Sequence, residues 1–219
     1  EGVLAARAGD LSGILNGIDM DVWNPETDPE ITPYSARSLA GKKKNRTALL
    51  AEFGLSPTKG PLAIIVSRLT SQKGMDLIAG AAEEFVANGG ALAILGSGDP
   101  QIEDDLRLLA RNNPGQVGLC IGYDEALSHR MFAGGDIVLV PSRFEPCGLT
   151  QLYGLRYGPV PVVAATGGLA DSVVNSNVAA TQMGVSTGFQ FHPIDQGVFA
   201  HCLRGVVDAF SRKTDWTRL

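Results

Sequence analysis

The sequence lacks several features that would mark particular classes of protein. It has no uninterrupted run of about 18 apolar residues, so no membrane-spanning helix is expected. Its first residues show no basic stretch followed by an apolar one, so no targeting peptide is visible. Positive charge is not in excess, because 18 Lys and Arg face 23 Asp and Glu, for a net charge of −5. Nucleic acid and anionic membranes are therefore not expected as partners, and a bound anion would need a local group of cations.

Cysteine is scarce, which excludes a further set of sites. The three cysteines, Cys120, Cys147 and Cys202, are odd in number, lie far apart and form no C-x-x-C pair. Neither a disulfide framework nor a zinc site is expected, and a reducing compartment fits best. His129 has no second ligand four residues further on, so no metal is predicted there. Cys147 alone lies in a motif, and a small residue at a helix start is favoured over a nucleophile, because no histidine is near it in sequence.

What the sequence does contain is a series of short apolar runs. They cover 62–66, 91–95, 117–121, 136–140, 160–164 and, more weakly, 188–191. The runs are nearly continuous rather than alternating, as expected for strands buried on both faces of a sheet. Helical patterns follow them at 75–88, 100–112, 124–133, 148–157, 171–179 and 195–210. This alternation predicts an α/β fold, a doubly wound, Rossmann-like parallel sheet of about six strands with helices on both faces.

The chain before the first strand divides into two parts. Residues 1–33 are dense in Pro, Asp and Asn and are predicted to form an irregular interdomain loop segment. From residue 34 to residue 53 the pattern is helical, and its basic run Lys42–Lys44 is predicted to be a solvated helix face. Residues 34–219 are then one doubly wound domain. The chain opens at Glu1 rather than at methionine, so we expect a fragment of a longer polypeptide.

Ligands of such sheets bind beyond the carboxyl ends of the strands, so the loops that follow the strands carry the candidate site. After the first strand, the loop SRLTSQKG brings Arg68 and Lys73 to the start of a helix at Gly74. A guanidinium, an ammonium and helix amides suit phosphate oxygens. The alternative is a pair of ordinary surface cations.

The next two loops give weaker signals. GSGD at 96–99 allows close approach of a ligand to the backbone, but a tight turn is the favoured interpretation, and the third glycine of a dinucleotide fingerprint is missing. After the third strand come Gly122 and Tyr123, followed by Asp124 as a candidate helix N-cap. The tyrosine suits stacking on a nucleobase, or equally packing on the sheet edge.

The stretch PSRFEPCGLTQL follows the fourth strand and leaves Glu145 just before a helix start at Gly148, Leu149 and Thr150. Amides at a helix start can face an anion, and an acid beside them suits a hydroxyl-rich group such as a sugar. No second carboxylate is paired with Glu145, as a hydrolytic glycosidase would need. The residues therefore favour group transfer from a nucleotide-activated sugar.

These motifs together resemble a known family. SRLTSQKG, GYDEALSHR, SRFEPCGLTQLYGLRYG, TGGLADSV and GILNGIDMDVWNP resemble the C-terminal half of the ADP-glucose-dependent bacterial glycogen synthases and plant starch synthases, over nearly the whole chain. The resemblance implies one half of a GT-B fold, in which residues 34–219 bind the nucleotide sugar and the N-terminal domain is absent. It implies transfer of glucose, with retention, to the nonreducing end of an α-1,4-glucan. It also implies that the chain alone is inactive, because the cleft needs both domains.

The resemblance also implies roles for individual residues. Arg68 and Lys73 would bind the donor phosphates and stabilise the departing diphosphate, so that with Glu145 they are the catalytic candidates. Tyr123 and Gly122 would contact the adenine, and Glu145 would lie against the glucose. The remaining predicted contacts, on the sugar and phosphate side, are Cys147, Gly148, Leu149, Thr150 and Asn16. No covalent nucleophile is assigned.

The implied partners are ADP-glucose or ADP, an α-1,4-glucan acceptor and the missing N-terminal domain, with no cofactor and no metal. The compartment would be the cytoplasm for a bacterial protein and the plastid stroma for a plant protein. Tyr153 stands eight residues after Glu145, where many related transferases carry a second glutamate, so the ribose contact is unassigned. Alternatives are a transferase that uses a UDP-sugar, a non-catalytic nucleotide-binding module and a flavodoxin-like regulatory domain.

Overall fold

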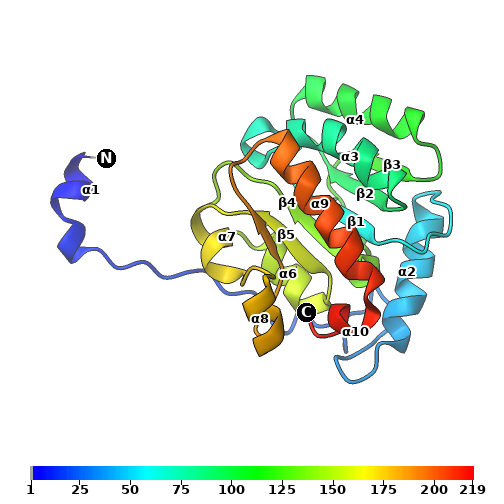
Figure 1. Cartoon of the computed structure of the whole chain (residues 1–219), viewed down its shortest axis with the longest axis horizontal. Coiled ribbons are helices and arrows are strands. Elements are labelled where there is room, and N and C mark those ends of the chain that lie inside the picture. The colour runs from blue at the N-terminus through cyan, green and yellow to red at the C-terminus, as the bar shows by residue number, and fades with distance from the viewer. Residues whose placement is uncertain (1) are drawn as a thin grey trace.

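A computed structural model describes residues 2–219, apart from the side chain at position 215. Its centre is a parallel sheet of six strands in the order β3-β2-β1-β4-β5-β6 (Figure 1). The strands are β1 Leu62–Val66, β2 Ala91–Gly96, β3 Val117–Ile121, β4 Ile137–Val140, β5 Val160–Ala164 and β6 Phe189–Phe191. Every predicted strand is confirmed to within one residue at each end. The prediction of a doubly wound, Rossmann-like α/β fold is confirmed as well.

Helices cover both faces of this sheet, whereas α1 Gly2–Ala6 lies apart from it at the end of an extended N-terminal arm (Figure 1). The other helices are α2 Ala40–Glu52, α3 Ile78–Ala87, α4 Pro100–Asn112, α5 Glu125–Gly134, α6 Thr150–Tyr157, α7 Gly167–Ser172, α8 Val178–Met183, α9 Gln196–Ser211 and α10 Lys213–Trp216. Three 3-10 helices, η1 Ala8–Asp10, η2 Ser71–Lys73 and η3 Met75–Leu77, lie in the connections. The helix predicted from residue 34 begins only at Ala40. Of the segment predicted as irregular, residues 2–33 are described, and they contain α1 and η1 but no other helix or strand.

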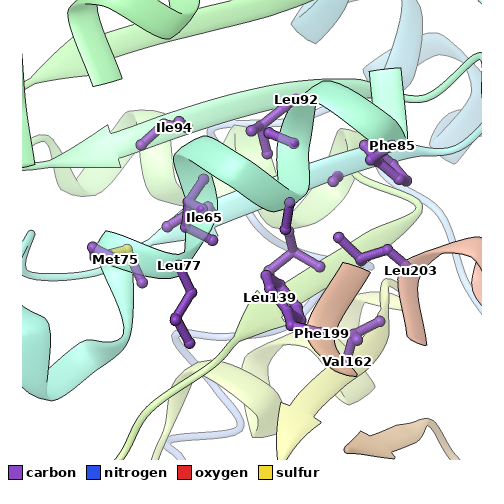
Figure 2. Packing of buried hydrophobic residues seen from close by; sticks show 14 of the residues in the cluster. Ile65, Met75, Leu77, Phe85, Leu92, Ile94, Leu139, Val162, Phe199 and Leu203 are labelled. Atoms are coloured by element: carbon purple, nitrogen blue, oxygen red, sulfur yellow. The ribbon is translucent and has the colours of Figure 1, made fainter. Parts of the chain in front are cut away.

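The strands read as continuous apolar runs because each face of the sheet has its own core. Successive residues of β1 point to opposite faces, so Leu62 and Ile64 join one cluster, whereas Ala63 and Ile65 join the other, all with no exposed surface. Helices α2 and α5 cover the first face, and α3 and α9 cover the second. Figure 2 shows side chains of α3 and α9 meeting those of the strands. Each fully buried leucine or isoleucine stabilises the fold by about 1.5–3 kcal/mol.

The helix predicted over 171–179 is wrong. The chain forms two short helices there, α7 and α8, with residues 173–177 extended between them. The backbone N–H of Val174 donates to Thr187 Oγ1 at 2.9 Å, and Asn175 pairs with Gly188 in an isolated parallel bridge. Asn177 then caps α8 by accepting a hydrogen bond from the N–H of Ala180 at 2.9 Å. The extended run therefore continues the hydrogen bonding of the sheet edge, which the local sequence does not indicate.

The basic run on α2 is also not a uniform solvated face. Lys43 and Lys44 are exposed, but the Nζ of Lys42 donates to three backbone carbonyls, of Ala133, Gly135 and Tyr157, at 2.9–3.1 Å. These carbonyls lie at the ends of α5 and α6, which have unsatisfied carbonyls in the last turn. Lys42 thus ties three helices together, and the prediction of a solvated side chain was wrong for it.

This lysine gives the stability of the protein a defined pH dependence. Burial lowers the pKa of Lys42 from 10.5 to about 8, and the charge of Asp136 opposes the shift. Between pH 8 and pH 10.5 the unfolded chain binds more protons at this position than the folded chain, so the unfolding free energy rises with pH. We expect the difference in unfolding free energy between the native chain and Lys42→Met to grow by about 1 kcal/mol from pH 8 to pH 9.

Urea unfolding at several pH values measures this difference. Subtracting the unfolding free energy of the variant removes the contributions of other groups, among them Tyr34 and Tyr157. Burial raises the pKa values of these two tyrosines, so their contribution to the unfolding free energy falls with pH above pH 10. Parallel pH profiles for the two proteins would contradict the prediction.

Candidate active site

The loops that follow β1 and β4 meet at the carboxyl edge of the sheet. β1 and β4 are neighbours although they are not consecutive, because the strand order reverses between them. Such a reversal opens a crevice at the ends of the strands, where ligands of doubly wound sheets bind. Lys73 from the first loop and Glu145 from the second form an ion pair across this crevice, with 19% and 12% of their side chains exposed. The structure therefore brings together two residues that lie 72 positions apart.

A cavity of about 420 Å³ lies beside this pair. It is bounded by the ends of β1, β2 and β3 and the start of α6, and four predicted site residues line it: Arg68, Gly122, Tyr123 and Thr150. A much smaller cavity next to it is lined by Lys73, Glu145 and Thr150, and both cavities share Val66 and Ser67. The predicted phosphate, base and sugar contacts thus border adjoining spaces.

The two predicted phosphate cations differ in their surroundings. Among residues 2–219, the guanidinium of Arg68 has neither a hydrogen bond nor an ion pair, and the residue is exposed at the cavity. The ammonium of Lys73, by contrast, is already paired with Glu145. An anion entering the site would meet Arg68 directly and would compete with Glu145 for Lys73.

Tyr123 does not pack on the sheet edge. Its side chain is 86% exposed, and its hydroxyl donates to Glu125 Oε2 at 3.1 Å, which raises the pKa of Tyr123. Asp124, between them, caps α5 by accepting from the N–H of Leu127 at 2.8 Å, as its position before the helix predicts. The ring is therefore free to stack on a flat group that enters the cavity.

The start of α6 presents a second set of polar groups. Leu149 precedes the helix, and among the described residues no side chain caps its first turn, so these N–H groups are available to an anion. Gly148 has φ of 76°, a conformation that favours glycine. Cys147 Sγ accepts a hydrogen bond from the N–H of Asn16 at 3.0 Å, which brings the predicted Asn16 to the same loop.

Two aromatic residues of the cavity wall, Trp23 and Tyr153, were not predicted to line the site. Their rings are stacked with centroids 3.8 Å apart, and the other face of Trp23 stacks on His129 at 3.9 Å. Burial is the main cause that raises the pKa of Tyr153. A lone tryptophan within a polar, proline-rich segment is a signal that could have indicated Trp23, because such a large apolar ring seldom stays in solvent.

The stack rests on a buried carboxylate. Asp28 accepts hydrogen bonds at Oδ2 from the hydroxyl of Tyr157 at 2.6 Å and interacts there with His129 Nδ1 at 2.7 Å. Its Oδ1 accepts from the N–H of Glu30 at 2.9 Å. These contacts explain His129, for which no metal was predicted. They also attach the segment before α2 to the domain and fix one wall of the cavity.

A larger cavity lies elsewhere in the described chain. It has a volume of about 640 Å³, is open to solvent and lies between α8, α9 and the edge strand β6. It contains none of the predicted site residues, and Asn175 and Asn177 at its border already accept hydrogen bonds from backbone N–H groups. The chemistry therefore points to the smaller cavity at the switch point.

Residues 2–219 contain neither a cluster of metal ligands nor a membrane-spanning helix. Nowhere among them do three or more His, Cys, Asp or Glu side chains gather in a way that could hold a metal ion. No helix in that range combines the length and the apolar character needed to cross a membrane.

Comparison with known proteins assigns the chain to a class. Residues 49–207 match the family model described as "Glycosyl transferases group 1", and the chain belongs to this family of glycosyltransferases. Glycogen synthases are among the members that it resembles. It is 55% identical, over its whole length, to glycogen synthases from Cereibacter sphaeroides and from Jannaschia sp.. It spans 45% and 46% of those two proteins, about half the length of the curated relatives that it matches.

The fold comparison agrees with the sequence comparison. The catalytic domain of starch synthase IV from Arabidopsis thaliana, solved with ADP and acarbose, superposes with a TM-score of 0.92 at 37% identity, over 99% of this chain and 45% of that one. The resemblance to glycogen and starch synthases is thus confirmed, as is the prediction of one half of a GT-B glycosyltransferase fold.

Proposed function

We propose that this chain is the donor-binding part of a glycogen synthase that takes glucose from ADP-glucose and adds it, with retention, to the nonreducing end of an α-1,4-glucan. The observation that carries the proposal is the meeting of Arg68, Lys73 and Glu145 at the crevice between β1 and β4. Two cations beside a helix start suit a diphosphate, and one acid next to them suits a sugar. The identity of 55% to bacterial glycogen synthases favours glycogen over starch as the product.

In this proposal the residues act by charge and position. Arg68 and Lys73 hold the diphosphate of the donor and stabilise the negative charge that grows on it as the glycosidic bond breaks. The donor displaces Glu145 from Lys73, which leaves the Glu145 carboxylate to accept hydrogen bonds from the glucose hydroxyls. The N–H groups at Leu149 and Thr150 add dipoles that favour an anion at the same point. Cys147, Gly148 and Asn16 shape the sugar side.

The nucleoside end of the donor would occupy the 420 Å³ cavity. Tyr123 stacks on the base and Gly122 lets the base approach the backbone, whereas Trp23 and Tyr153 form the facing wall. An adenine nucleotide is favoured over UDP because the starch synthase with a TM-score of 0.92 was solved with ADP. A protein solved with UDP-glucose resembles this chain at 18% identity, which is evidence for the fold alone. The acceptor glucan and the second wall of the cleft are assigned to the part of the enzyme that lies outside this chain.

Calorimetric titration of the chain with ADP tests the proposal. We expect ADP to bind more tightly than UDP. We also expect Arg68→Ala to weaken ADP binding by roughly tenfold or more, because a hydrogen bond to a charged group contributes about 1.5–3 kcal/mol. Arg111→Ala, at an exposed arginine of α4, is the control for the loss of a positive charge and should leave ADP binding unchanged.

The alternatives give different results. Tighter binding of UDP than of ADP would favour a transferase that uses a UDP-sugar. A folded chain that binds neither nucleotide would overturn the proposal.

A further inference from the structure

Arg143 lies two residues before Glu145, yet its side chain reaches out of its own loop. Its Nη1 and Nη2 donate to Asp76 Oδ1 at 2.6 Å and Oδ2 at 2.8 Å, a two-pronged contact between a guanidinium and a carboxylate. Nη1 also donates to the carbonyl of Ser71 at 2.7 Å. The backbone N–H of Arg143 donates to the carbonyl of Gln72 at 2.9 Å. Arg143 thus donates four hydrogen bonds to a single segment, residues 71–76, of the loop after β1.

The partners of Arg143 lie on both sides of Lys73 in the sequence. Ser71 and Gln72 precede it in η2, and Asp76 follows it in η3. The contacts therefore join the two loops close to the ion pair. In the loop after β1 they involve residues within three positions of Lys73, and in the loop after β4 they involve a residue two positions before Glu145. We call these contacts of Arg143 with residues 71–76 the Arg143 clamp.

The clamp is better suited to fixing geometry than to stabilising the fold. Arg143 and Asp76 have 38% and 39% of their side chains exposed, and ion pairs in such surroundings contribute little to stability. A planar fork bound through two parallel hydrogen bonds does, however, fix the orientation of one loop relative to the other. Lys73 depends on such support because its side chain is long and flexible, and small displacements of charged groups weaken their action on a ligand.

We propose that Arg143 is a positioning residue, which acts through Asp76 to set the Lys73 ammonium and the Glu145 carboxylate side by side for the donor. This inference rests on the proposed function, since the donor diphosphate is the ligand that Lys73 would bind. Arg143 itself faces residues 71–76 and is not assigned a contact with the donor.

ADP titrations of matched variants test the clamp. Arg143→Ala and Asp76→Ala should each weaken ADP about three- to tenfold and shift the unfolding midpoint little. The control is Arg204→Ala, because Arg204 pairs with Glu84 between α9 and α3 at a similar exposure, 44% and 39%. This variant should bind ADP like the native chain. Equal affinities in the native chain, Arg143→Ala and Asp76→Ala would overturn the inference while the proposed function stands.

A double-mutant cycle separates positioning from a general structural role. In a Lys73→Ala background, Arg143→Ala should cause no further loss of ADP affinity, because the group that the clamp positions is gone. A full additional loss in that background would show that Arg143 acts otherwise, and the inference would fail. The exchanged pair Arg143→Asp with Asp76→Arg should recover part of the affinity that either single reversal loses.

A measurement without nucleotide keeps the inference distinct from the proposed function. A lysine ammonium held in an ion pair exchanges its protons slowly enough for a side-chain ¹H–¹⁵N signal at low temperature. We expect a signal of Lys73, assigned by its loss in Lys73→Ala, in the native chain and in Arg204→Ala, and we expect it to broaden away in Arg143→Ala. Persistence of the signal in Arg143→Ala would contradict the clamp whether or not ADP binds.

Discussion

Replacing Asp28 with alanine is expected to lower the unfolding free energy by about 3–5 kcal/mol, because it removes a buried charge from the middle of a hydrogen-bond network. The carboxylate has no exposed surface, and its oxygens are hydrogen-bonded to the Tyr157 hydroxyl, the His129 ring and the N–H of Glu30. Without it, the Tyr157 hydroxyl and the His129 ring nitrogen remain buried with no partner. Unpaired buried polar groups each cost about 1–3 kcal/mol.

A surface carboxylate provides the control for this substitution. Asp99 is exposed and caps α4 by accepting from the N–H of Gln101 at 2.9 Å, so Asp99→Ala should cost only about 1 kcal/mol. Urea unfolding followed by circular dichroism measures both variants. Equal losses would show that Asp28 acts as an ordinary turn residue and that the network contributes nothing of its own.

Asp28→Ala should also alter the proposed nucleoside cavity. Asp28 holds His129, His129 stacks on Trp23, and Trp23 stacks on Tyr153 in the cavity wall. A variant that still folds should therefore bind ADP more weakly, although Asp28 itself does not line the cavity.

The sequence allowed the sheet to be predicted because its signal is local. Each strand is an apolar run set by burial on both faces, and each run is visible without knowledge of its neighbours. The same rule placed Arg68, Lys73 and Glu145 at one edge, because all parallel strands end there. The ion pair of Lys73 with Glu145 could not be predicted in this way. It depends on β1 lying next to β4, and strand order is set by how helices cross the sheet.

The features that were missed depend on contacts between distant parts of the chain. Asp28 meets His129 and Tyr157 across 101 and 129 residues, so the segment before α2 looked like a plain loop although it builds a wall of the cavity. Lys42 looked like part of a solvated run because its partners are backbone carbonyls. Every residue has a carbonyl, so the sequence gives no sign of which ones Lys42 contacts. Local patterns predict which residues face inwards, whereas pairs of polar groups become visible only when the topology is known.

A second large effect is expected at Gly74, which lies directly after Lys73. Its φ is 70°, a conformation that a residue with a Cβ adopts at a cost of about 1–2 kcal/mol. A Cβ placed on Gly74 would in addition collide with the backbone carbonyl of Pro141, directly after β4. Backbone cannot turn aside as a flexible side chain can, so the two loops would have to separate. We expect Gly74→Ala to lower the unfolding free energy by about 3 kcal/mol or more, since overpacking adds about 1–3 kcal/mol to the conformational cost.

Gly54 is a matched control within the same chain. It has φ of 64°, close to that of Gly74, but a Cβ added there meets nothing within 4 Å. Gly54→Ala should therefore show the conformational cost alone, about 1–2 kcal/mol, and the difference between the two variants should report the collision. Equal losses of unfolding free energy would mean that the loops after β1 and β4 can separate without cost. If the loops separate as expected, Gly74→Ala should also weaken ADP more than Gly54→Ala does, because Lys73 moves away from Glu145 together with the backbone that carries it.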